Sequence, residues 1–185
     1  MKVACIQSSA GENYNKNFKQ IIRLINQSIK NKADLIITPE TTSLITSNKR
    51  MLYKNTFKMN NDPLIKKIKE IAKKNKKWIL IGSLSIKDKN KYRNRSIMID
   101  YKGKIAAYYD KIKMFDVKLP NKEQHKESKT YKPGNKLISV KLPWGRLGLT
   151  ICFDLRFPEI YRNLSKKKLN FISVPSAFTK ITGQK

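Results

Sequence analysis

The chain has 185 residues, the usual size of one domain and enough to bury a hydrophobic core. Its 41 Lys and Arg against 13 Asp and Glu give a formal net charge of +28, and its longest apolar runs, such as residues 79–81, are too short to span a bilayer. Two cysteines and one histidine are too few for a Cys/His-rich structural zinc site. With no charged-then-apolar leader before the first strand-like run, we expect a cytoplasmic protein with reduced thiols.

The positive charge is spread over the chain. A field of this sign attracts polyanions, so a basic nucleic-acid-binding module is one alternative function. The lysines are interleaved with Asn and Ile in nearly every segment, however, and form no dense arm with aromatic residues. Joint abundance of Lys, Asn and Ile suggests nucleotide bias in the coding sequence. We therefore expect no specific nucleic-acid partner, only weak and salt-sensitive adhesion to polyanions.

Short apolar runs predict β-strands, and apolar residues recurring every three or four positions predict amphipathic helices. In chain order the pattern predicts a strand at 2–7, a helix at 15–30, a strand at 34–38, a helix from Pro63, a strand at 78–82 and a hairpin of strands 96–100 and 104–109. It then predicts strands at 137–142 and 146–151, a helix at 158–167 and a strand at 170–174. Alternation of strands and helices around one hairpin indicates an α/β fold with a mixed sheet. No glycine-rich phosphate loop is present, so nothing supports nucleotide binding.

Three titratable residues follow predicted strands, where ligands gather in open α/β sheets: Glu40, Lys111 and Cys152. A cysteine at a strand-to-helix junction can have its pKa lowered by backbone N–H groups and cations. A nearby carboxylate would take the thiol proton, and a lysine would stabilise the oxyanion of a tetrahedral intermediate. Taken singly, each residue also has an ordinary structural explanation: a buried apolar thiol, a helix-terminal charge and a solvated lysine.

Two other residues could compete for a role in catalysis. His125, the only histidine, lies in a polar segment that reads as a solvated loop, so a Cys–His dyad has little support. Cys5 lies within the first predicted strand and reads as a core residue.

Three segments carry a family resemblance. LIITPE at residues 35–40, YDKIKMFD at 109–116 and LTICFDLRFPE at 149–159 resemble the signature segments of the nitrilase superfamily of carbon–nitrogen hydrolases, in the family's order and with comparable gaps. The resemblance extends through ESKTYKPG at 127–134 and VPSAFTKITG at 174–183, and so covers the whole chain. It implies one hydrolase domain over residues 1–185 with an α/β/β/α sandwich fold.

The resemblance also implies roles for individual residues. The general base falls on Glu40, the oxyanion-stabilising lysine on Lys111, the nucleophile on Cys152 and the additional pocket glutamate on Glu127. The backbone N–H of Phe153 is the implied second oxyanion donor; relatives commonly have Tyr there, so any role of that hydroxyl is absent. The family needs no metal or cofactor.

Fragments at 115–117, 156–159 and 175–178 resemble the branch that contains deaminated-glutathione amidase and ω-amidase. The resemblance therefore implies hydrolysis of a small carboxylic-acid amide through a cysteine thioester, with an N-carbamoyl or nitrile substrate as the alternative within the same fold. Arg156 is a candidate for binding the substrate carboxylate, because a guanidinium matches that group bidentately. A structural ion pair of Arg156 with Asp154 or Glu159 is the alternative.

Relatives continue beyond the position of Lys185 through further strands and a helix. We therefore expect these residues to be about the N-terminal two-thirds of the family domain, which leaves the sandwich incomplete at its C-terminal end. Family members dimerise through the helices near the nucleophile and at the carboxyl end, so a homodimer is the expectation for the full-length domain.

Overall fold

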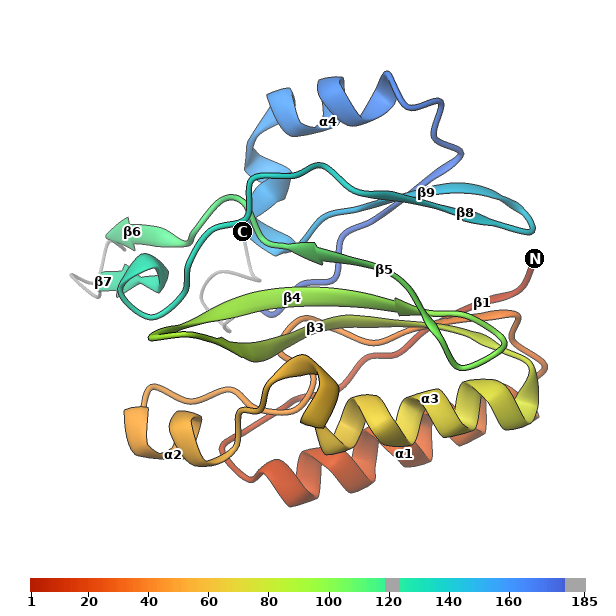
Figure 1. Ribbon diagram of the computed structural model, residues 1–185, viewed down its shortest axis with the longest axis horizontal. Coiled ribbons are helices and arrows are strands. Elements are labelled where there is room, and N and C mark those ends of the chain that lie inside the picture. Colours follow the sequence, from red (N-terminus) through yellow and green to blue (C-terminus); the bar gives the residue numbers. More distant parts are fainter. Residues whose placement is uncertain (119–123, 179–185) are drawn as a thin grey trace.

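The computed structural model describes residues 1–118 and 124–178. Its elements stack in four layers, which Figure 1 shows nearly edge-on: two long helices, a five-stranded sheet, a three-stranded sheet and one further helix. This is the α/β/β/α arrangement that the family resemblance implied.

The larger sheet has the order β1-β2-β3-β4-β5, with bounds Val3–Cys5, Leu35–Ile37, Trp78–Asp88, Lys91–Ile99 and Ile105–Asp110. The smaller sheet has the order β10-β9-β8, where β8 is Ser139–Leu142, β9 is Gly145–Leu149 and β10 is Phe171–Ser173. A separate ribbon joins β6 (Asp116–Lys118) to β7 (Gln124–Lys126). The helices are α1 (Tyr14–Lys30), α2 (Lys49–Lys54), α3 (Pro63–Asn75) and α4 (Pro158–Ser165), and short 3-10 turns cover Met59–Asn61, Glu127–Lys129 and Cys152–Arg156.

Helices α1 and α3 begin at side-chain caps and cover one face of the larger sheet. Asn13 accepts a hydrogen bond from the N–H of Lys16, and Asp62 accepts from the N–H groups of Leu64 and Ile65, so each cap satisfies N–H groups that a helix start leaves open. Isoleucines on both helices pack against isoleucines of β2, β3 and β4 to form one hydrophobic core. The apolar periodicity of the sequence therefore gave the correct buried faces.

A second core lies between the two sheets. It contains Leu80 of β3, Met98 of β4 and Tyr109 of β5 on one side, and Leu147 and Leu149 of β9 on the other. Strands β1, β2 and β3 are parallel, as are β9 and β10, so the carboxyl ends of β1 and β2 lie side by side, next to Leu80 of the longer strand β3.

The sequence pattern predicted two neighbouring strands that are shorter than those observed. Strand β3 continues past residue 82 to Asp88 and returns as β4 from Lys91, with Lys89 at a positive φ of 53° in the turn between them. The prediction stopped early because Ser, Lys and Arg interrupt the apolar run there, yet the partner strands make these positions part of the sheet. Helix α2 and the β6–β7 ribbon were also missed.

Two predictions about single residues were wrong. Cys5 is exposed, because β1 is an edge strand and only the side of Ala4 packs against the helical core. His125 lies in strand β7 opposite Val117, is half-buried and packs 5.4 Å from the ring of Phe115, so it is not in a solvated loop. Within the described residues, no helix is both long and apolar enough to cross a membrane.

Candidate active site

Glu40 lies in a tight turn after β2 and is only 6 % exposed. The turn is fixed against β3 by main-chain bonds, since Thr42 N–H donates to Ser83 O and Ser83 N–H donates to Pro39 O, at 3.0 and 3.2 Å. The hydroxyl of Ser83 also accepts from Thr41 N–H at 2.9 Å. These bonds hold the turn of Glu40 just beyond the carboxyl end of β2, beside the middle of β3.

Gly82 makes this approach of the turn to β3 possible. A Cβ at this position would lie 2.0 Å from Thr38 O, 2.4 Å from Pro39 O and 2.7 Å from Cβ of Pro175. Real Cβ atoms do not approach backbone oxygens so closely, so glycine allows the strand to run directly beneath the turn.

Lys111 follows the last residue of β5 and is 2 % exposed. Its N–H donates to Asn94 O at 2.9 Å and its carbonyl accepts from Gly134 N–H at 2.8 Å, so both sides of its backbone are held. Its ammonium Nζ lies 3.0 Å from Oε1 of Glu40 and 3.0 Å from Oε2 of Glu127. The two carboxylates therefore flank one buried cation.

Glu127 begins the 3-10 turn after β7 and is anchored by a second segment. Its Oε2 accepts a 2.7 Å hydrogen bond from the N–H of Phe115, in addition to the bond from Lys111. Residues far apart in the sequence thus converge on this carboxylate.

Cys152 lies beyond the end of β9, at the first position of a 3-10 turn, with a positive φ of 44°. Left-handed backbone is uncommon for a residue with a side chain and is held here by neighbouring bonds. The N–H of Cys152 donates to Pro175 O at 3.0 Å, and Asp154 Oδ2 accepts from Ile151 N–H at 2.9 Å. The turn places the thiol close enough to Glu40 for that carboxylate to raise the pKa of the thiol.

Asp154 is fully buried and links the cysteine turn to the lysine segment. Its carboxylate accepts from the hydroxyl of Tyr109 at 2.7 Å and from the N–H of Lys113 at 2.9 Å, besides the bond from Ile151. Burial raises the pKa of Asp154, and these three donors act in the opposite direction. The residues on both sides of Lys111 are therefore tied to the turn that carries Cys152.

The segment after β10 closes the site from another direction. The N–H of Ala177 donates to Oε2 of Glu40 at 3.0 Å, while Pro175 accepts from Cys152 as described. The structure thus brings Glu40, Lys111, Glu127 and Cys152, the four residues that the family resemblance singled out, into one cluster.

The electrostatics of Lys111 favour a stable positive charge. Burial alone would lower the pKa of Lys111, but the charges of Glu40 and Glu127 outweigh it and hold the pKa above its ordinary value. The lysine therefore carries its charge at any pH where an enzyme works.

The electrostatics of Cys152 correct an expectation. Burial raises the pKa of the Cys152 thiol to about 11, with further increases from the charge and hydrogen bond of Glu40, while Lys111 lowers it. The lowered pKa that the strand-to-helix position suggested is wrong, because loss of hydration and a neighbouring carboxylate outweigh the nearby cation. The resting thiol is protonated at neutral pH and needs a base to react.

Phe153 and Arg156 lie on the same turn as Cys152. The ring of Phe153 packs edge-on against Phe115 at 5.1 Å and against Phe157 at 5.4 Å, forming an apolar wall. Arg156 is exposed. The two ion pairs considered for it do not form: Asp154 is bonded as above, and Glu159 pairs with Lys113 at 3.1 Å.

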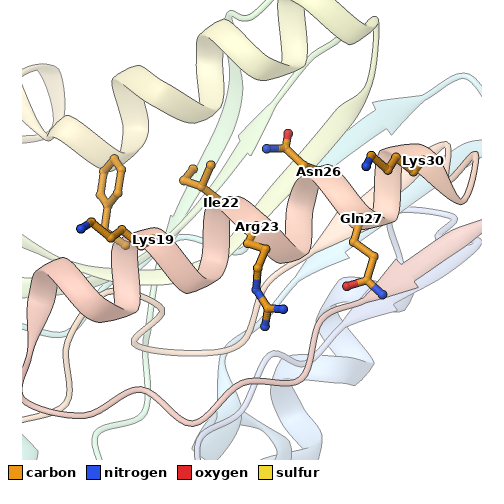
Figure 2. A pocket seen from close by; sticks show the side chains of 7 residues that line it. Lys19, Ile22, Arg23, Asn26, Gln27 and Lys30 are labelled. Atoms are coloured by element: carbon orange, nitrogen blue, oxygen red, sulfur yellow. The ribbon is translucent and has the colours of Figure 1, made fainter.

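A surface hollow of about 590 Å³ lies elsewhere, along the outer face of α1. Figure 2 shows that its labelled side chains, including Ile22, Arg23 and Lys30, all come from this one helix. It contains none of the predicted site residues and no carboxylate, so the candidate active site remains the buried cluster.

The sequence did not single out Asn94 or the main chain of Ala177. Asn94 lies on β4 and donates to both Glu40 and Glu127. A signal was present, because Asn94 shares its strand face with Ser96 and Met98 and is a polar residue on an inward-facing position. Ala177 lies within the fragment 175–178 that carried the family resemblance, but nothing local indicated that its N–H would bond to Glu40.

The sequence matches the carbon–nitrogen hydrolase family over residues 2–185, and the chain belongs to that family, the nitrilase superfamily anticipated from the three segments. Among curated relatives, it is 37 % identical to the deaminated glutathione amidase of Yersinia enterocolitica and 34 % identical to that of Dictyostelium discoideum. These alignments cover 98 % and 96 % of the chain, but 64 % of each relative, so the chain spans slightly less than two-thirds of their length.

The fold is also similar to a solved structure, that of the Caenorhabditis elegans NitFhit protein. The TM-score is 0.87 at 32 % identity, over 98 % of this chain and 45 % of that one. The four-layer architecture is therefore that of the family.

Proposed function

We propose that this protein hydrolyses the carbon–nitrogen bond of a small carboxylic-acid amide through a thioester on Cys152. The observation that carries the proposal is the cluster itself: a protonated thiol beside the Glu40 carboxylate, and an ammonium held between two carboxylates. This arrangement supplies a nucleophile, a base and an oxyanion partner without a histidine.

The first half-reaction forms the thioester. Glu40 takes the proton of Cys152 as the sulfur attacks the amide carbonyl carbon, and the carbonyl oxygen becomes an oxyanion. Lys111 has three N–H donors, of which the carboxylates of Glu40 and Glu127 accept two, so the third is directed to the oxyanion together with the Phe153 N–H. Glu40 then gives the proton to the departing nitrogen, and ammonia leaves.

The second half-reaction releases the acid. Water attacks the thioester carbonyl as Glu40 takes one of its protons, and the same donors stabilise the second oxyanion. When the intermediate collapses, the carbon–sulfur bond breaks and the thiolate regains a proton from Glu40. The pKa of about 11 for the Cys152 thiol suits this return, because the resting state is the neutral thiol.

The test uses ammonia release by the purified chain from a panel of ω-amides of 2-oxo acids, deaminated glutathione, N-carbamoyl amino acids and nitriles. We expect turnover of one or more carboxylic-acid amides, and loss of that turnover in Cys152→Ala. Cys5→Ser is the matched control and should retain it, since Cys5 is exposed on the edge strand. Turnover by Cys152→Ala would contradict the thioester route, and exclusive turnover of nitriles or N-carbamoyl compounds would contradict the substrate class.

Relatives named deaminated glutathione amidase support a substrate that carries a carboxylate as well as the amide. We assign the carboxylate contact to Arg156, which is exposed on the nucleophile's own turn. Arg156→Ala should raise KM roughly tenfold for such substrates, because a hydrogen-bonded charge pair is lost. A neutral amide of similar size is the control, and an equal rise in its KM would argue against this contact.

We extend the proposal to assembly and location. Leu155, next to the candidate substrate arginine, is 54 % exposed, which supports a homodimer contact at the helix that follows the nucleophile. Light scattering of Leu155→Glu should report a monomer if the unaltered protein is a dimer through this face. Both cysteines are free thiols, in keeping with a cytoplasmic location, which cell fractionation would test.

A further inference from the structure

Asn94 lies at the centre of the charged cluster although it carries no charge. It is 3 % exposed, and its Nδ2 atom lies 2.9 Å from Oε1 of Glu40 and 3.1 Å from Oε1 of Glu127. A primary amide has two N–H donors, so one side chain provides a separate hydrogen bond to each carboxylate. The amide thus bridges the two acidic residues on either side of Lys111.

The orientation of this amide follows from the charges around it. If its oxygen faced the cluster, it would be repelled by both carboxylates, so the nitrogen must face them. The other end, Oδ1, is then buried and has no hydrogen-bond partner among the described residues. An unpaired buried acceptor costs free energy, and the two charge-assisted bonds must offset that cost. The side-chain orientation therefore provides hydrogen bonds to both carboxylates and leaves Oδ1 without one among the described residues.

The main chain of Asn94 contacts the third charged residue. Its carbonyl accepts the 2.9 Å hydrogen bond from Lys111 N–H, just beyond the last pair of β4 with β5. One residue of β4 therefore holds the backbone of Lys111 and the side chains of Glu40 and Glu127. Because β4 lies between β3 and β5 in the larger sheet, this position is rigid.

A neutral double donor is well suited to this place. Two carboxylates around one ammonium repel each other, and the bridge adds a restraint on their Oε1 atoms to the main-chain bonds that hold their Oε2 atoms. A lysine or arginine at this position would pair with Glu40 and weaken it as a base. An amide fixes the two Oε1 atoms and leaves the net charge of the cluster unchanged.

We propose that Asn94 is a positioning residue that fixes Glu40 and Glu127 relative to Lys111 for the amide hydrolysis. The role of Asn94 in turnover rests on the proposed function. Its structural content, the bridging of two carboxylates beside the thiol, can be tested without a substrate.

The first experiment compares the steady-state kinetics of Asn94→Ala and Asn94→Leu with those of the unaltered chain. We expect kcat to fall roughly 10- to 100-fold, the loss typical of hydrogen bonds to charged groups, with KM changed less than about threefold. Asn94→Ser, which keeps one donor, should fall between, and serves if the larger changes impair folding.

Ser96→Ala is the matched control. Ser96 lies on the same strand and the same face, is fully buried and loses one hydrogen bond, to Ile81 O, without touching the cluster. Circular dichroism confirms folding of each variant. If kcat and KM of the Asn94 variants matched those of Ser96→Ala, the inference would be overturned.

The second experiment separates this inference from the function. In a Cys5→Ser background, the rate of Cys152 alkylation by iodoacetamide is followed against pH, with no substrate present. The rise of the alkylation rate with pH should move to higher pH in Asn94→Ala but not in Ser96→Ala. Glu127→Gln should reduce the effect of Asn94→Ala, because one of the two bridged charges is then absent. If the unaltered chain released no ammonia but the pH shifts were seen, the proposed function would be refuted and the role of Asn94 would stand. If the unaltered chain released ammonia but the pH shifts were absent, the role of Asn94 would be refuted and the proposed function would stand.

Discussion

The hydroxyl of Tyr109 donates a 2.7 Å hydrogen bond to Oδ2 of Asp154, and this bond ties the end of β5 to the turn that carries Cys152. Both groups are buried, and burial raises the pKa of Tyr109, an effect that the charge of Asp154 reinforces. The tyrosine therefore stays protonated and keeps donating. Lys111 and Cys152 owe their relative position in part to this pair.

Tyr109→Phe removes that donor and leaves Asp154 with two N–H donors. We expect the free energy of unfolding to fall by about 1–3 kcal/mol, the cost of a lost hydrogen bond to a buried charged group, as measured by urea denaturation. Tyr108→Phe is the control: Tyr108 is 46 % exposed, and the ring that stacks on Arg95 is retained. If both variants lost the same free energy of unfolding, the hydrogen bond from Tyr109 to Asp154 would contribute nothing measurable to stability.

Glu40→Gln and Lys111→Met should change the titration of Cys152 in opposite directions. The charge of Glu40 raises the pKa of the thiol and that of Lys111 lowers it, around a value of about 11. The alkylation rate of Cys152 should therefore reach its half-maximum at lower pH in Glu40→Gln and at higher pH in Lys111→Met, although both variants lose turnover. Thiolate absorbance at 240 nm is an independent measurement, and shifts of the same sign would contradict the proposed geometry.

Cys5 should react with iodoacetamide before Cys152 at pH 8. Cys5 is exposed, whereas burial and Glu40 raise the pKa of Cys152, so little thiolate is present there. Peptide mass spectrometry after partial labelling measures the ratio directly. Faster labelling of Cys152 would mean that Glu40 deprotonates it even without substrate.

Gly82→Ala should displace the turn of Glu40, because the new Cβ would meet the backbone oxygens of Thr38 and Pro39. Overpacking against backbone costs about 1–3 kcal/mol, and a shifted base should lower kcat at least tenfold. Gly11→Ala is the control, since nothing lies within 4 Å of a Cβ at that position. A Gly82→Ala chain of normal stability and turnover would show that the turn can adjust.

Much of the fold followed from local pattern. The apolar spacing of residues 15–30 predicts α1 to within one residue of its observed bounds, and Pro63 predicts the observed start of α3. The hairpin β3–β4 was missed because the apolar run ends at Gly82, and beyond it only Leu84 and Ile86 of β3 are apolar while the start of β4 is polar; these positions join the sheet through their partner strands.

The sequence by itself determined the fold class and the family, because hydrophobic periodicity and three signature segments are local properties that survive without coordinates. The match to the family's signature segments made candidates of Glu40, Lys111, Glu127 and Cys152, and the chemical roles of these residues stay predictions. Only the tertiary structure decided how they are held and how they titrate. Glu40 takes a hydrogen bond from Ala177, 137 residues away, and Asn94 bridges two carboxylates from separate segments. Burial and neighbouring charge, which set the pKa of Cys152, arise only when such distant segments pack together.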